Sequence, residues 1–161
     1  LSGNVGGGLA ARRRGQVMGA RYVVSACLAG ERCRYDAGDN TCAKVVRLVE
    51  EVRAVPLCPE TLGGLETPRS PCERVGDRVM NRDGQDVTEP FELGAAQAVD
   101  IARKEGCSAA ILKSRSPSCG FDRIYDGSFS HVFCAGDGVW AAMLRREGFA
   151  LYSEESLPDE P

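Results

Sequence analysis

The sequence "SAAILKSRSPSCGF", residues 108–121, decides the fold because it shows where a buried strand ends and a polar loop begins. Its apolar first half is typical of a short strand inside a sheet. The loop that follows contains three serines, a proline, a glycine and a cysteine. A connection from a strand to a helix needs only a turn residue and an N-cap. A thiol in this loop therefore indicates a function.

The rest of the chain alternates strands and helices in the same way. Apolar and β-branched runs predict strands, and apolar residues at helical spacing predict helices. The expected strands are 21–27, 54–58, 108–113 and 149–153, and the expected helices are 40–52, 88–105 and 139–148. Segment 73–88 predicts a β-hairpin that turns at Asp83-Gly84. Long loops are expected at 28–40, 59–71 and 124–138.

This order predicts an α/β fold of three layers, Rossmann-like or flavodoxin-like, with a mostly parallel sheet and helices on both faces. A chain of 161 residues is long enough for one such domain. We expect the domain to occupy residues 20–155. Residues 1–19, rich in glycine and poor in hydrophobic side chains, predict a disordered leader, and 156–161 predict a flexible acidic tail.

Composition narrows the classes of function. The net charge of −3 argues against a globally basic nucleic-acid surface, so a nucleic-acid partner is not favoured, although a local basic patch stays open. No apolar run approaches the roughly 20 residues that cross a bilayer. "RRR" (12–14) is not followed by an apolar stretch of signal-peptide length, so we expect a cytoplasmic protein without a membrane partner. Eight cysteines in a reducing compartment indicate metal ligands or reactive thiols.

Three of the cysteines follow predicted strands. Cys27 ends the first strand, Cys58 ends the second, and Cys119 lies in the loop after the third. Because ligands of open parallel sheets bind beyond the carboxyl ends of the strands, these thiols are expected to converge on a metal or iron–sulfur site. The alternative is that each simply fills space, as buried cysteines often do. Cys42 and Cys107 look like such filler, and the loop thiols have no assigned role: Cys33, Cys72 and Cys134.

Six segments, taken in order, resemble the small single-domain thiouracil desulfidases, a family formerly catalogued as a domain of unknown function. The resemblance covers roughly residues 21–155. The segments are "VVSACLAGERCRYD" (23–36), "LCPETLGGLETPRSP" (57–71), "DGQDVTEPFELGA" (83–95), "AILKSRSPSCG" (110–120), "IYDGSFS" (124–130) and "GDGVWAAMLRREG" (136–148).

The resemblance implies a [4Fe–4S] cluster held by three cysteines, with one iron free of protein ligands. The positions that match the family's ligands are Cys27, Cys58 and Cys119, which the strand ends had already singled out. The family's catalytic acid matches Glu60, and a serine of its last cysteine motif matches Ser116.

The expected reaction is non-redox hydrolysis of the C–S bond of a thiolated pyrimidine, a small molecule of the 2-thiouracil type. The open iron is soft enough to take the sulfur, and water attacks the carbon. Glu60 is two residues from a ligand and is expected to act as general acid or base. Ser116 is expected to orient the base or to relay a proton. A solvated loop carboxylate is the plainer interpretation of Glu60.

Three further residues are candidates for binding substrate. Arg69 could balance the negative cluster or hold a substrate carbonyl, and Tyr35 could stack on a pyrimidine. Ser118 lies beside Cys119, the third of the candidate ligands, in the sequence. The alternative for Arg69 is an ion pair at the surface, and the alternative for Tyr35 is ordinary packing. We expect a monomer or a weak homo-oligomer.

Two other classes of function stay open at this point. In the first, Cys27, Cys58, Cys119 and a fourth cysteine such as Cys33 hold a structural Zn²⁺ in a closed site without catalysis. In the second, the chain is a binding module that recruits thiolated RNA. The lack of a basic excess argues mildly against the second, because phosphate contacts dominate nucleic-acid affinity.

Overall fold

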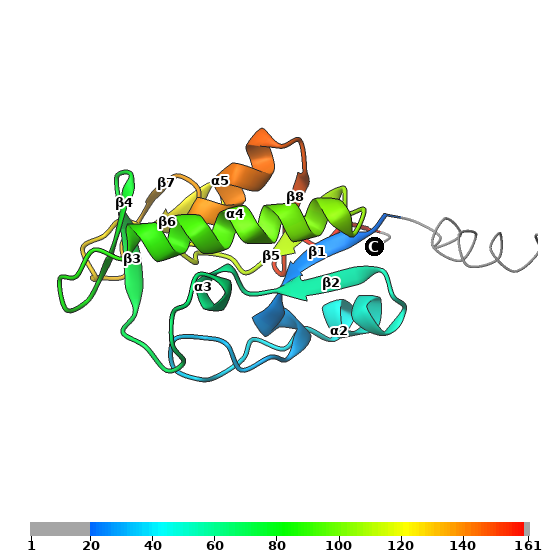
Figure 1. Ribbon diagram of the computed structural model, residues 1–161, viewed down its shortest axis with the longest axis horizontal. Helices are drawn as coiled ribbons and strands as arrows, with labels where there is room; N and C mark the ends of the chain where they lie inside the picture. Colours follow the sequence, from blue (N-terminus) through cyan, green and yellow to red (C-terminus); the bar gives the residue numbers. More distant parts are fainter. Residues whose placement is uncertain (1–19, 160–161) are drawn as a thin grey trace, which may run out of the picture.

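The computed structural model of the protein describes residues 20–159, so the predicted leader 1–19 and the last two residues of the tail lie outside the described part. At its centre four parallel strands form a sheet of order β2-β1-β5-β8 (Figure 1). These strands are β1 (Tyr22–Ser25), β2 (Ala54–Leu57), β5 (Ala109–Leu112) and β8 (Ala150–Ser153). The helices are η1 (Ala26–Ala29), α2 (Ala43–Glu50), α3 (Pro59–Leu62), α4 (Thr88–Lys104) and α5 (Val139–Arg146).

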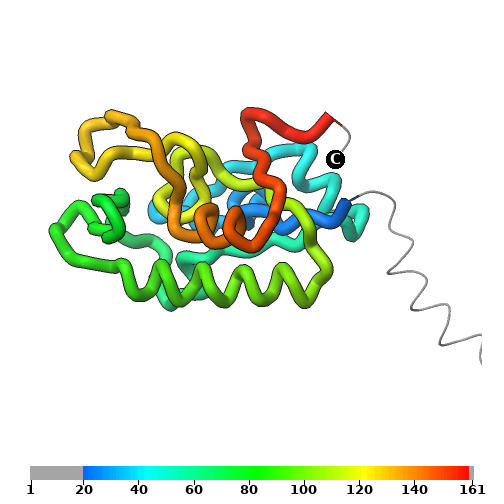
Figure 2. The backbone as a smooth tube through the Cα atoms, turned by 90° about the horizontal axis from the view of Figure 1, so that it is seen from above, coloured from blue at the N-terminus to red at the C-terminus, as the bar shows by residue number. Residues whose placement is uncertain are grey.

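Helices cover both faces of the sheet because successive residues of each buried strand point to opposite sides. On one face, Val23 of β1 lies in the same apolar core as Phe91 of α4 and Trp140 of α5. On the other face, the next residue, Val24, packs in a second core with Val45 of α2. Figure 2 shows α4 and α2 on opposite sides of β1. The predicted three-layer α/β fold with a parallel sheet is confirmed.

Two antiparallel hairpins extend from this sheet, and both correct the sequence prediction. The first joins β3 (Cys72–Val75) to β4 (Arg78–Asn81), and the second joins β6 (Arg123–Tyr125) to β7 (Phe133–Ala135) inside a segment predicted as loop. The first hairpin turns at residues 76–77, where Gly76 takes a φ of +62°. The predicted pair Asp83-Gly84 makes a later turn, after which one bridge joins Asp86 to Met80.

The first long helix also starts later than predicted. Asp39 accepts hydrogen bonds from the backbone N–H and the hydroxyl of Thr41, which holds the chain in a turn. Asn40, the predicted N-cap, instead turns its side chain to Cys27. The helix α2 therefore begins at Ala43.

The order of the strands fixes where a site can form. The chain proceeds from β1 outward to β2 and then crosses back to β5, so the direction of winding reverses between β1 and β5. At such a switch point the loops after the two strands diverge and leave a crevice at the carboxyl edge.

The short helix α3 is placed by a contact between two glycines. A Cβ built on Gly63, just after α3, would lie 2.0 Å from the carbonyl oxygen of Pro90 in α4. A Cβ built on Gly94 would lie 1.8 Å from the carbonyl oxygen of Pro59 in α3. Only glycine lets the two backbones approach this closely.

Among residues 20–159, no helix is both long and apolar enough to span a membrane.

Candidate active site

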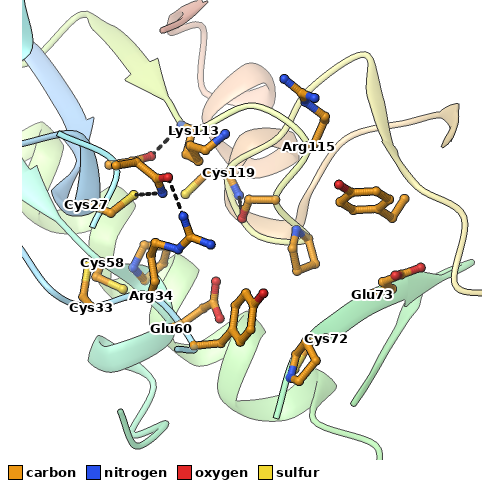
Figure 3. A pocket seen from close by; sticks show the side chains of 18 of the residues that line it. Cys27, Cys33, Arg34, Cys58, Glu60, Cys72, Glu73, Lys113, Arg115 and Cys119 are labelled. Carbon is orange, nitrogen blue, oxygen red and sulfur yellow. Dashed lines mark hydrogen bonds between the residues drawn. The ribbon is translucent and has the colours of Figure 1, made fainter. Parts of the chain in front are cut away.

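A cavity of about 380 Å³ opens at the carboxyl edge of the sheet. Its wall includes Cys27 after β1, Cys58 after β2 and Cys119 after β5. Figure 3 shows these side chains and that of Glu60 facing one space. Parallel strands end at the same edge, which is why residues so remote in sequence meet here. The structure thus brings together the three thiols that the strand ends predicted.

Cys27 is held in a polar environment. Asn40 donates a hydrogen bond of 3.4 Å from Nδ2 to its Sγ. The side chain of Asn40 is oriented in turn by Arg34, whose Nη1 donates to Asn40 Oδ1 at 2.7 Å. Since an amide that accepts at its oxygen must present its NH₂ group elsewhere, Arg34 directs the amide donor to the sulfur.

Cys119 is held by a tight turn that also caps α5. The Oγ of Ser116 accepts the backbone N–H groups of Ser118 at 3.1 Å and of Cys119 at 3.0 Å. The carbonyl of Ser118 accepts the N–H of Trp140 at 2.9 Å, in the first turn of α5. A Cβ at Gly138 would lie 2.6 Å from that carbonyl oxygen, so glycine is required for the loop and the helix to meet.

A fourth thiol, Cys33, lies between Cys27 and Cys58. Its proton is shared by hydrogen bonding with both neighbours, which lowers the pKa of Cys27 and lowers that of Cys58 to about 5. The same bonds raise the pKa of Cys33, which therefore keeps its proton. Burial raises the pKa of Cys119. Of the predicted ligands, Cys58 is thus the most readily ionised, and the thiolate is the form of cysteine that binds metals.

Glu60 projects into the same cavity from α3. Burial raises the pKa of its carboxyl group, the charge of Arg69 opposes this rise, and Cys58 adds to it. The side chains of Glu60 and Arg69 form an ion pair of 3.1 Å and are only 16% and 9% exposed. A buried carboxyl group with a raised pKa is suited to proton transfer near neutral pH.

The residues predicted to bind substrate lie in three different situations. Tyr35 lines the cavity and is 42% exposed. Arg69 lines it too, but its guanidinium is bound to protein groups. Ser118 is completely buried behind the loop and is not part of the cavity wall, because its neighbour Cys119 takes the position that faces the site. The substrate-binding role predicted for Ser118 has no support from its position.

Comparison with known proteins identifies the family. The model described as 2-thiouracil desulfurase matches residues 22–156, which is most of the chain. The chain belongs to the 2-thiouracil desulfurase family.

Two relatives of this chain extend the comparison. A solved structure, named as the [4Fe-4S]-dependent thiouracil desulfidase TudS, is 43% identical and superposes with a TM-score of 0.83 over 88% of this chain and 95% of that one. A Bacillus subtilis (strain 168) protein, the uncharacterized protein YbbK, is 42% identical over 147 residues, which is 85% of this chain and 97% of the relative.

In this 2-thiouracil desulfurase family member, three residues near the cavity had no role in the predicted cluster site, although Cys33 was a candidate for the alternative zinc site. Cys33 and Cys72 line the cavity, although neither follows a strand of the central sheet. Glu73 is buried in the wall and accepts the backbone N–H groups of Gly127 and Phe129, so it holds the loop between β6 and β7 beside the cavity. The two contacts of Glu73 could not be read from sequence, because they join the two hairpins across more than 50 residues.

Proposed function

We propose that this protein removes sulfur from a thiolated pyrimidine of the 2-thiouracil type by hydrolysis of the C–S bond, with a [4Fe–4S] cluster as cofactor. The observation that carries the proposal is the convergence of Cys27, Cys58 and Cys119 on one cavity that also contains Glu60. Membership of the 2-thiouracil desulfurase family and 43% identity to a protein named as a [4Fe-4S]-dependent thiouracil desulfidase support it.

The residues present fit such a cluster in the chemistry of their donors. Iron–sulfur clusters are bound by cysteine thiolates, and three thiols that follow three separate strands line this cavity. Within residues 20–159, no group of three or more His, Cys, Asp or Glu side chains is arranged around a single metal ion. A cluster contains several irons, so its ligands need not surround one point. Cys27, Cys58 and Cys119 would hold it, and when bound it would supply a soft Lewis acid for sulfur.

The protein groups account for the movement of protons. In the overall reaction the oxygen of water forms a bond to the ring carbon, the C–S bond breaks, and both protons of water end on sulfur, so no electron is transferred. Glu60 is the proton carrier: its carboxylate accepts a proton from the attacking water and returns it to the departing sulfur. The raised pKa that burial gives this carboxyl group suits both directions of transfer.

Ser116 has a narrower role, which its contacts define. Its Oγ already accepts two backbone N–H groups, so both lone pairs are engaged. The hydroxyl proton is the group left for substrate. Ser116 therefore acts as a hydrogen-bond donor to the oxygen or ring nitrogen of the pyrimidine, and does not act as a base. Tyr35, at the cavity wall, offers an aromatic face to the ring.

The proposal is tested by anaerobic reconstitution of the protein with iron and sulfide, followed by incubation with 2-thiouracil. We expect a brown protein that converts 2-thiouracil to uracil and releases one sulfide for each uracil formed. A colourless protein that retains zinc and releases no sulfide would instead support the structural metal site. Binding of thiolated RNA without sulfide release would support the binding module.

A further inference from the structure

Arg69 uses every N–H donor of its guanidinium on protein groups. Its Nε donates to Glu60 Oε1 at 3.2 Å, and Nη2 donates to the same oxygen at 3.1 Å. The second proton of Nη2 goes to the carbonyl of Cys33 at 2.9 Å. Nη1 donates to the carbonyl of Glu66 and to the hydroxyl of Thr67, both at 3.0 Å. A guanidinium has five N–H donors, and these five contacts engage all of them.

The contacts join three segments of the cavity wall. Glu60 belongs to α3, Glu66 and Thr67 belong to the loop after it, and Cys33 lies on the loop after η1. The backbone N–H of Arg69 adds a hydrogen bond of 2.7 Å to the carbonyl of Tyr35 on that same loop. Arg69 thus fixes the position of α3 relative to the loop that carries Cys33.

The arrangement is asymmetric at the carboxylate. Both Glu60 contacts of Arg69 go to Oε1, which leaves Oε2 as the oxygen available for proton exchange in the cavity. From this geometry we infer that Arg69 is a positioning residue: it fixes the Glu60 carboxylate with Oε2 directed to the reaction, and it does not bind substrate. The inference rests on the proposed function for the role of Glu60, and it replaces the substrate-binding role that the sequence predicted for Arg69.

Lysine cannot substitute for this arrangement. An ammonium group keeps the positive charge, but it cannot make a planar double contact to Glu60 and also reach the Cys33 and Thr67 groups. Arg69→Lys therefore preserves the charge near Glu60 and removes the geometric restraint. Misplacement of a catalytic group by about 1 Å costs on the order of 10²-fold in rate. We expect a fall of kcat of that order with KM unchanged.

The test uses the reconstituted protein with 2-thiouracil and compares Arg69→Lys, Glu60→Gln and the double variant, with Arg103→Lys as the control. Arg103 lies on the outer surface of α4 and pairs with Glu147, remote from the cavity wall. Iron content and visible absorbance are measured for each variant. If Arg69 acts through Glu60, adding Arg69→Lys to Glu60→Gln lowers kcat no further. Multiplying effects, or a raised KM with normal kcat, would overturn the inference while leaving the proposed function intact.

A second readout does not depend on turnover. The guanidinium of Arg69 binds the carbonyl of Cys33, whereas the bond to the carbonyl of Tyr35 comes from the backbone and survives substitution. Loss of the side chain should therefore loosen the loop at Cys33. Alkylation of the Cys33 thiol by iodoacetamide is followed by peptide mass spectrometry. We expect Arg69→Gln to accelerate this alkylation by about tenfold or more, which corresponds to the loss of about 1.4 kcal/mol or more of restraint. The control, Arg103→Gln, should leave the rate unchanged. If wild-type protein fails to turn over 2-thiouracil, the proposed function fails, and this readout still decides the restraint by Arg69. An unchanged alkylation rate in Arg69→Gln would refute it.

Discussion

Gly63 and Gly94 meet backbone to backbone: a methyl group built on Gly94 would lie 2.7 Å from the amide nitrogen of Gly63 and 1.8 Å from the carbonyl oxygen of Pro59. This contact holds α3 against α4. Since Cys58 precedes α3 and Glu60 lies within it, the contact also sets the position of two residues of the site.

Gly94→Ala should therefore damage the site from a distance. Helix propensity alone would favour alanine by up to about 1 kcal/mol. Overpacking against a backbone that cannot give way costs about 1–3 kcal/mol, and we expect this cost to prevail. Urea unfolding of the variant measures the net effect, and the iron content after reconstitution measures the displacement of α3. Gln97→Ala, at an exposed position of the same helix, is the control. A Gly94→Ala protein as stable as wild type, with full iron content, would contradict the prediction.

Removal of any one predicted ligand should abolish cluster binding. Cys27→Ala, Cys58→Ala and Cys119→Ala each delete a thiol that faces the cavity, whereas Cys134 is exposed on β7 and serves as the matched control. Iron and acid-labile sulfide are measured after anaerobic reconstitution. We expect near-complete loss in the three variants and none in Cys134→Ala. Retention of the cluster in Cys119→Ala would mean that another thiol takes its place.

Cys33→Ser separates the cluster from a closed zinc site. If Cys33 serves only as a hydrogen-bond donor to Cys27 and Cys58, serine preserves a donor and the iron content should stay at the wild-type level. If four cysteines hold zinc, the same change removes a ligand and the metal is lost. Metal analysis of the purified variant distinguishes the two results.

Glu60→Gln should leave the cluster in place and remove the proton carrier. General acid–base catalysis contributes about 10²–10⁴-fold, so we expect kcat for 2-thiouracil to fall within that range. Glu66→Gln, an exposed carboxylate on the following loop, is the control for lost negative charge. Sulfide release at the wild-type rate from Glu60→Gln would exclude the role assigned to this residue.

The start of α4 should be sensitive to acid. Hydrogen bonding with the side chain of Thr88, a bond of 2.9 Å from the backbone N–H of Thr88 and an ion pair of 2.7 Å with Arg78 lower the pKa of Asp86 to about 2. A carboxylate whose pKa is depressed in the folded state stabilises the fold above its unfolded pKa, near 3.9, and loses that effect as the pH falls towards 2.

The corresponding experiment compares melting temperatures across this pH range. Wild-type protein should lose more stability between pH 5 and about 2 than Asp86→Asn, which lacks the titrating group. Asp83→Asn removes a nearby negative charge without removing the bond to Thr88, and should follow the wild-type curve. Parallel curves for wild type and Asp86→Asn would contradict the assignment.

The sequence predicted the parts of the molecule that local patterns determine. The helix over residues 88–104 is visible in apolar spacing, and the site at the strand ends follows from parallel topology. The turn at residues 76–77 was missed because two glycine–aspartate pairs compete within nine residues, at 76–77 and 83–84, and local chemistry does not rank them. The late start of α2 depends on Asn40 reaching Cys27, which is a tertiary contact.

The sequence predicted that Cys27, Cys58, Cys119 and Glu60 would meet, as they do in the cavity, but not the contacts that support them. Cys27, Cys58 and Cys119 could be chosen because each follows a strand. The sequence could not predict that the N–H donors of the Arg69 side chain all bind protein groups, or that Ser118 is buried, since both depend on how separate loops pack. A residue that lies next to a ligand in sequence can point away from it in space, as Ser118 does.

The pairing of β1 with β5 has a consequence for how the protein matures. These adjacent strands lie more than 80 residues apart along the chain, and Cys119 comes later still. A nascent polypeptide that extends just past β2 can pair β1 with β2 and carries Cys27 and Cys58, but it lacks β5 and Cys119. If these three thiols hold the cluster, we expect its loading to follow synthesis of about three quarters of the chain.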